Sequence, residues 1–156
     1  MRLLAIELVA GIACFSHTHA DQIRPMTGTD AANKATILLV DDEQSVRAIV
    51  LKILRRAKYD VIDAENGEAA LGVADAHNGG IDLLITDMYM PGLRGPEVAQ
   101  RLGAKRRGLR VLFMSGYADQ DARTAVPSGA NFLNKPFSGK DLVAAVEAAL
   151  KGPPIS

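Results

Sequence analysis

Acidic side chains follow two short apolar runs of the chain, at the points where those runs end. Asp41 and Asp42 come directly after the run 36–40, and Asp87 follows the run 81–86. If the two runs form neighbouring parallel strands, the three carboxylates meet at one edge of the sheet. Carboxylates that are this crowded repel one another at neutral pH unless protons or a cation relieve the repulsion. The three residues therefore predict a cation site.

The ligand chemistry and two further residues point to phosphate. Oxygen ligands without His or Cys favour Mg²⁺, with Mn²⁺ as the alternative, and Mg²⁺ commonly bridges to phosphoryl oxygens. Ser115 ends a fourth apolar run, and Lys135 follows a fifth. A single Asp after a strand is more often a helix cap, and a single Lys is usually a solvated surface charge. We expect a site here because all these residues fall at one edge of the sheet.

The elements that must position these residues alternate regularly along the chain. Apolar runs of strand length are followed by segments whose apolar residues recur at helical spacing. We predict strands over 36–40, 60–64, 81–86, 111–115 and 130–133, and helices near 46–57, 68–77, 96–105 and 118–125, with a last helix capped by Ser138. The helix over 118–125 has the weakest pattern. Five such repeats with short connections predict an α/β fold, in which helices cover both faces of a parallel sheet.

The composition excludes several classes of protein. The 156 residues are 48% hydrophobic and 23% charged, which suits one soluble domain. Eighteen basic and eighteen acidic residues leave no net field that would attract nucleic acid. Cys14 is the only cysteine, so an intramolecular disulfide and a multi-cysteine zinc site are excluded. We interpret the basic cluster as a solvated helix end and not as a nucleic-acid surface; it comprises Arg101, Lys105, Arg106, Arg107 and Arg110.

The first 35 residues differ in character from the rest. Residues 3–15 are apolar apart from Glu7, and this stretch is too short to span a membrane. The layout resembles a secretory signal, but Glu7 argues against one. A signal-like segment, a disordered tail, an amphipathic helix and a start site placed too early remain open. We expect residues 1–35 to be tail and linker, residues 36–151 one domain and residues 152–156 a short tail without an output domain, and we expect the protein to be cytoplasmic.

Residues 36–151 resemble a response-regulator receiver domain of two-component signalling systems. The matching pieces, in order, are Ile37–Glu43, Asp82–Asp87, Met90–Gly92 with Gly95, Met114–Gly116 and Asn134–Phe137. The resemblance implies a flavodoxin-like sheet of five parallel strands in the order 2-1-3-4-5. It also implies a cis peptide bond between Lys135 and Pro136.

The resemblance further implies a role for each site residue. Asp87 falls at the phosphoacceptor. Asp41 and Asp42 fall at the acidic pair that holds Mg²⁺ together with Asp87, and the backbone carbonyl of Tyr89 completes the protein ligands.

Three more residues match positions of the family that respond to the phosphoryl group. Ser115 and Lys135 are the groups that contact it. Phe132 is the aromatic residue whose rotamer changes with Ser115 on phosphorylation.

The implied function is phosphoacceptance in a phosphorelay. The partners would be a histidine kinase or phosphotransfer protein and a downstream protein, with a homodimer possible, and with no nucleic acid and no membrane span. The domain would not be an enzyme beyond its own phosphorylation and dephosphorylation. The domain would be either a stand-alone regulator or a receiver detached from a hybrid sensor kinase. The resemblance of residues 112–117 to receivers attached to such kinases favours the second alternative slightly.

Other classes of α/β protein fit the sequence less well. An aspartyl-phosphate hydrolase needs a second Asp two positions after its nucleophile, where this chain has Tyr89. A nucleoside triphosphatase of the P-loop type needs a Gly-rich loop after the first strand, and a flavodoxin-like cofactor binder needs a hydroxyl-rich one. The acidic residues 41–43 stand in that place.

Overall fold

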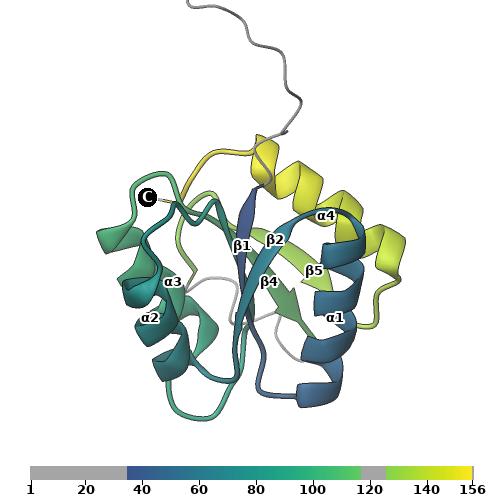
Figure 1. Ribbon diagram of the computed structural model, residues 1–156, viewed down its shortest axis with the longest axis horizontal. Coiled ribbons are helices and arrows are strands. Elements are labelled where there is room, and N and C mark those ends of the chain that lie inside the picture. Colours follow the sequence, from purple (N-terminus) through teal and green to yellow (C-terminus); the bar gives the residue numbers. More distant parts are fainter. Residues whose placement is uncertain (1–34, 117–125, 156) are drawn as a thin grey trace, which may run out of the picture. The chain divides into compact units, whose positions relative to one another are not determined.

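The computed structural model describes residues 35–116 and 126–155, which contain one parallel sheet of five strands (Figure 1). The strands are β1 (Thr36–Val40), β2 (Asp60–Ala64), β3 (Leu83–Asp87), β4 (Arg110–Ser115) and β5 (Asn131–Asn134). Their order across the sheet is β2-β1-β3-β4-β5, and each neighbouring pair is parallel. The expected strand order is confirmed. It places β1 and β3 side by side, as the acidic site requires.

Helices cover both faces of the sheet. They are α1 (Gln44–Arg56), α2 (Gly67–Ala76), α3 (Gly95–Lys105) and α4 (Gly139–Lys151). Figure 1 shows α1 and α4 on one face of the sheet, and α2 and α3 on the other. The helix predicted over residues 118–125 lies outside the described residues.

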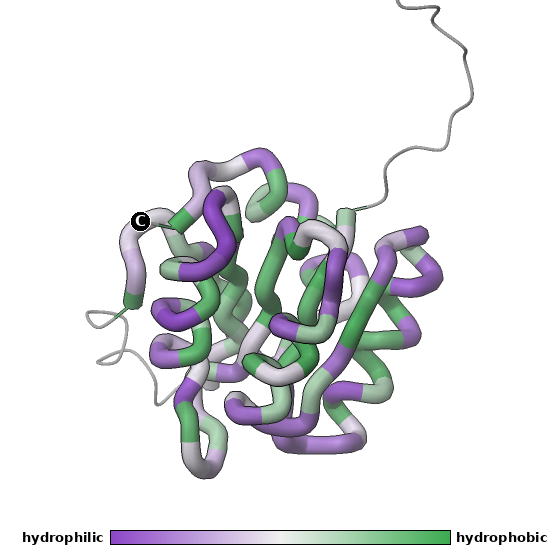
Figure 2. Tube along the Cα trace, turned by 60° about the vertical axis from the view of Figure 1, so that its left-hand side comes forward, coloured by the Kyte–Doolittle hydropathy of each residue, from purple (hydrophilic) through white to green (hydrophobic). Residues whose placement is uncertain are grey.

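The central strands are buried on both faces, which explains their continuous apolar sequences. In β1, Ile37 and Leu39 pack with residues of α1 and α4, whereas Leu38 and Val40 pack with residues of α2 and α3. All four side chains are fully buried. Successive strand residues point to opposite faces, so the sheet separates two apolar clusters. In Figure 2 the hydrophobic segments accordingly run through the interior strands.

Local capping interactions define where helices begin, and so fix the loops at the carboxyl edge of the sheet. The Asn66 side chain accepts a hydrogen bond of 2.8 Å from the Ala69 N–H at the start of α2. The Ser138 hydroxyl accepts one of 3.2 Å from the Asp141 N–H at the start of α4. These caps satisfy N–H groups that have no partner within the helix.

Three strands differ in their limits from the prediction: β4 begins at Arg110 instead of Val111, β5 spans Asn131–Asn134 instead of 130–133, and β3 differs at both ends. β3 begins at Leu83 instead of Ile81 and ends at Asp87 instead of Thr86. Asp82 lies just before the strand, and its carboxylate accepts a hydrogen bond of 2.8 Å from the Thr36 N–H at the start of β1. At the other end Asp87 still pairs in register with Met114 of β4. The predicted acceptor is therefore held by the sheet itself.

The segment after α4 packs against the domain, although we predicted a tail. The Ile155 N–H donates a hydrogen bond of 3.0 Å to the Leu109 carbonyl, and Arg110 Nε donates one of 2.9 Å to the Gly152 carbonyl. The Ile155 side chain packs against the same apolar cluster as Val126 and Ala130. The chain thereby crosses from α4 to the side of the sheet that carries α3 (Figure 1).

Candidate functional site

Three carboxylates converge at the carboxyl edge of the sheet. Asp41 and Asp42 follow β1, and Asp87 ends β3, the strand beside β1. One carboxylate oxygen of each residue lies within 4.8 Å of the others. The predicted convergence is confirmed. It follows from the register, which pairs Val40 with Thr86 and so brings the next residues of both strands together.

The three carboxylates differ in their surroundings. Asp41 is fully buried, Asp42 is exposed, and Asp87 is partly exposed. Asp41 Oδ1 accepts a hydrogen bond of 2.9 Å from the Glu43 N–H. Burial raises the pKa of Asp41, and the positive charge of Lys135 and the Glu43 hydrogen bond offset this only in part. The exposed Asp42 and the partly exposed Asp87 leave the site open to a ligand from solvent.

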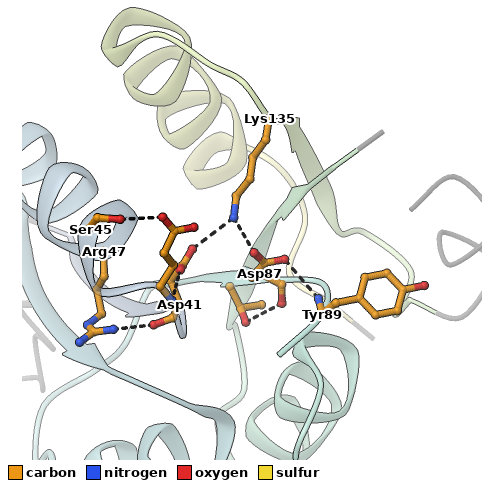
Figure 3. A network of polar contacts seen from close by, with 8 residues as sticks. Asp41, Ser45, Arg47, Asp87, Tyr89 and Lys135 are labelled. Carbon is orange, nitrogen blue, oxygen red and sulfur yellow. Dashed lines mark hydrogen bonds and ion pairs between the residues drawn. The ribbon is translucent and has the colours of Figure 1, made fainter. Parts of the chain in front are cut away.

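Lys135 bridges two of the acidic residues. Its ammonium nitrogen lies 2.5 Å from Asp87 Oδ2 and 3.3 Å from Asp41 Oδ2 (Figure 3). Burial alone would lower the pKa of Lys135, but the hydrogen bond and charge of Asp87, followed by the charge of Asp41, outweigh it and raise the pKa. The lysine is therefore held in its charged form and neutralises part of the acidic cluster.

The backbone around Lys135 directs its side chain into the site. Its N–H donates a hydrogen bond of 2.7 Å to the Ser115 carbonyl at the end of β4. The Lys135–Pro136 peptide bond is cis, as expected. Lys135 thus follows β5 directly and reaches back across the ends of the strands.

Ser115 and Phe132 occupy the strands next to the acidic cluster. Ser115 is fully buried at the end of β4, and its hydroxyl donates a hydrogen bond of 3.1 Å to Asn134 Oδ1. Phe132 in β5 is partly buried and packs on Phe113 of β4, with ring centroids 5.7 Å apart. The structure thus places Ser115 at the predicted edge. Its hydroxyl is bound to Asn134, a partner that we did not predict.

Tyr89 stands at the outer side of the site. Its N–H donates a hydrogen bond of 3.2 Å to Asp87 Oδ1, while its ring points away from Asp41 and Lys135 (Figure 3). Tyr89 is 45% exposed, and the guanidinium carbon of Arg94 lies 5.5 Å from the centroid of its ring. The expected role of the Tyr89 carbonyl as a metal ligand stays a prediction.

The donor atoms of the cluster suit a hard divalent cation. Asp41, Asp42 and Asp87 offer only carboxylate oxygens, and their separation allows one ion to contact all three. Oxygen-only ligation with an exposed side is what Mg²⁺ requires, because this ion retains some of its water. The residues present therefore fit Mg²⁺ better than zinc.

Two structural residues of the site were not given these roles from the sequence. Arg47 had no predicted role, but its guanidinium donates a hydrogen bond of 2.7 Å to the Asp41 carbonyl and pairs with Asp63 at 3.4 Å. A basic residue in the first turn of a helix is unfavourable to the helix dipole, and this was a signal that it has a specific partner. Gly95 permits a close approach: a Cβ there would lie 2.1 Å from the Asp87 carbonyl oxygen.

The basic cluster at the end of α3 is solvated in part: Arg101, Lys105 and Arg107 are exposed, as we interpreted, whereas Arg106 and Arg110 are half-buried. Lys105 pairs with Asp75 of α2 at 2.8 Å. Arg106 donates hydrogen bonds to backbone carbonyls at the end of α2, including that of Ala74. Arg110 binds the carbonyl of Gly152. These contacts tie α2, α3 and the C-terminal segment together.

Comparisons with known proteins identify the family. Residues 37–147 match the model of the response regulator receiver domain. The chain is 34% identical over 125 residues to the sensor kinase CckA of Brucella abortus, covering 79% of this chain and 13% of that protein. It is also 34% identical to the response regulator receiver protein CpdR of the same organism, over 73% of this chain and 95% of CpdR.

A solved structure agrees with the sequence relatives. The receiver domain of the hybrid histidine kinase CckA is 37% identical, with a TM-score of 0.65, over 75% of this chain and all of that one. The chain belongs to the response-regulator receiver domain family, whose members are signalling domains of two-component systems. Among the first relatives, it spans about half of the regulator ResD of Bacillus subtilis and a smaller part of CckA.

Within the described residues, no helix is both long enough and apolar enough to cross a membrane.

Proposed function

We propose that this chain accepts a phosphoryl group on Asp87 in a two-component phosphorelay, assisted by Mg²⁺. The observation that carries the proposal is the 2.5 Å contact between Lys135 Nζ and Asp87 Oδ2, beside two further carboxylates at the carboxyl edge of the sheet. A partly exposed carboxylate in such a setting is accessible to a phosphoryl donor. The adjacent ammonium offers positive charge where a phosphoryl group would bring negative charge.

The positions of these groups support the following phosphoryl transfer. A carboxylate oxygen of Asp87 attacks the phosphorus of a phosphohistidine on the donor protein. A bond forms between this oxygen and phosphorus, the phosphorus–nitrogen bond breaks, and the imidazole leaves with the electron pair and takes up a proton. The ammonium of Lys135 moves from the carboxylate to an oxygen of the transferred group. Hydrolysis by water later restores Asp87.

Asp41 and Asp42 would hold the metal ion together with Asp87 and the Tyr89 carbonyl. When bound, Mg²⁺ supplies positive charge that offsets the charge on the transferred phosphoryl oxygens. Asp41 is suited to retain the metal ion. Its carboxylate is buried and held by the Glu43 N–H, so water does not compete with the ion for it. Asp42 contributes a ligand from the exposed side.

Ser115 and Phe132 would transmit the change to a partner. The Ser115 hydroxyl leaves Asn134 and turns to the phosphoryl group, which draws the end of β4 toward Asp87. Phe132 then moves against Phe113, its neighbour in β4. A local change of charge thereby biases a packed element between two arrangements.

The wider assignments rest on the family. The donor would be a histidine kinase or a phosphotransfer protein, and the signal would pass to a downstream partner protein or through a homodimer. We place the receiver domain at residues 36–151 and the protein in the cytoplasm. The identity to the CckA receiver suggests descent from a hybrid kinase.

Intact-protein mass spectrometry tests the proposal. The protein is incubated with acetyl phosphate and Mg²⁺, and one added phosphoryl group is expected. Asp87→Asn should abolish the addition, whereas Asp75→Asn, which changes a surface carboxylate paired with Lys105, should leave it intact. Equal labelling of the Asp87→Asn variant would show that another residue is the acceptor.

A further inference from the structure

The exposed side chain of Tyr89 starts from a backbone position directly beside the acceptor, Asp87. Its backbone N–H is bound to Asp87 Oδ1 at 3.2 Å, so the side chain begins next to the carboxylate. A tyrosine ring occupies one of three staggered positions about its first side-chain torsion, and rotation by about 120° carries it to a different side of the backbone. The position of this ring therefore affects how open the mouth of the site is.

Arg94 holds the ring in its outward position. The guanidinium carbon lies 5.5 Å from the ring centroid, within the range of a cation–π interaction. Arg94 itself is fixed through its backbone, because its N–H donates a hydrogen bond of 2.9 Å to Glu97 Oε2 at the start of α3. The backbone from which the guanidinium extends is thus held at the start of α3. Figure 3 shows the ring directed away from Lys135 and Asp41.

We propose that Arg94 is a positioning residue that keeps the Tyr89 ring off the mouth of the Asp87 site. This inference rests on the proposed function. It adds a residue that influences how fast Asp87 is phosphorylated and how fast its phosphoryl group is hydrolysed. With Arg94 in place, both a phosphoryl donor and the hydrolytic water reach Asp87. Without it, the ring also occupies positions that cover the acceptor, and both steps become slower.

The size of the effect follows from the strength of the contact. A cation–π pair at an exposed site contributes about 0.5–1 kcal/mol, which corresponds to a two- to fivefold change in population. Arg94→Ala should therefore slow both phosphorylation by acetyl phosphate and loss of the phosphoryl group, by at most about two- to fivefold. The backbone hydrogen bond to Glu97 does not depend on the Arg94 side chain, so the thermal midpoint should stay close to that of the wild type.

A double-mutant cycle separates this role from a direct effect of charge. If Arg94 acts through the ring, Arg94→Ala should change neither rate in a Tyr89→Ala background. In protein that keeps Tyr89, Arg94→Lys retains a cation. Its rates of phosphorylation and of phosphoryl loss should lie between those of Arg94→Ala and the wild type. An effect of Arg94→Ala that persists without the Tyr89 ring would overturn the inference, and so would unchanged rates in the single variant. Wild-type protein that is not labelled at all would instead overturn the proposed function.

Discussion

Lys135 and Asp87 are 48 residues apart in the chain, and their side chains meet at 2.5 Å. Lys135 follows β5 and Asp87 ends β3, so the lysine side chain reaches across the end of β4, which lies between these strands. The ammonium also lies 3.3 Å from the buried Asp41. One lysine therefore neutralises the acceptor and the most buried carboxylate of the cluster. Several expectations about variants follow from this arrangement.

Replacing Lys135 should separate the binding of metal from the chemistry. Lys135→Met keeps the length of the side chain and removes its charge. We expect phosphorylation by acetyl phosphate to become on the order of 100-fold slower, as when one charge-stabilising donor is removed from an active site. Mg²⁺ should bind at least as tightly as before, because a competing cation has been removed.

Isothermal titration calorimetry and the rate of mass addition measure the two effects. Lys140→Met, a change of an exposed lysine at the start of α4, is the matched control and should alter neither. Undiminished phosphorylation in Lys135→Met would contradict the assigned role of the lysine.

Added Mg²⁺ should stabilise the folded protein. A ligand that binds only the folded state contributes about 2.7 kcal/mol at 100 times its dissociation constant, so the thermal midpoint rises with Mg²⁺ concentration. Asp42→Asn should suppress this rise because it removes one ligand of the cluster. Asp42 is exposed, so the variant should fold normally without metal.

Differential scanning calorimetry with and without Mg²⁺ measures the shift. Asp75→Asn serves as the control and should retain the full response. If Asp42→Asn also retained it, the metal would bind elsewhere.

Gly95 should be intolerant of any side chain. A Cβ at this position would lie 2.1 Å from the Asp87 carbonyl oxygen, so the start of α3 must move away from the acceptor strand. We expect Gly95→Ala to destabilise the protein by about 2–3 kcal/mol, as overpacking of a rigid site does. The variant should also phosphorylate more slowly, because Asp87 shifts with its backbone.

Gly72 offers a matched control in α2. No atom lies within 4 Å of a Cβ built there, so Gly72→Ala should stabilise the helix by about 0.5–1 kcal/mol. Urea unfolding compares the two variants. Equal free energies of unfolding for both would show that the close approach is not a constraint.

Ile155 should contribute to stability although it follows the last helix. Its side chain packs against the cluster between the sheet and α3, and its N–H binds the Leu109 carbonyl. Ile155→Ala should lower the free energy of unfolding by about 1–2 kcal/mol, less than the loss for a fully buried isoleucine. Ile49→Ala, at a position that is 60% exposed, should cost little in the same denaturation experiment. Similar values for the two variants would mean that residues 152–155 do not belong to the folded unit.

The sequence predicted β1 well because this strand is buried on both faces, and it also located the partly exposed edge strand β2. The runs at 36–40 and 60–64 match β1 and β2 residue for residue. The acidic cluster could be located because each Asp stands at the end of a strand and the expected strand order makes those strands neighbours. The hydrogen bonds of Arg106 could not be foreseen, since a basic residue on a polar helix face looks the same whether it is solvated or bound to a carbonyl. The packing of Ile155 was also missed, because the sequence around Pro153 and Pro154 has no periodicity.

The central claim is that Asp87 is the phosphorylated residue. The most direct test treats the protein with acetyl phosphate and Mg²⁺, reduces the acyl phosphate with borohydride, and locates the modified residue by peptide mass spectrometry. We predict that residue 87 is converted to homoserine in the treated sample alone. Homoserine at position 41 or 42, with residue 87 unmodified, would contradict the account.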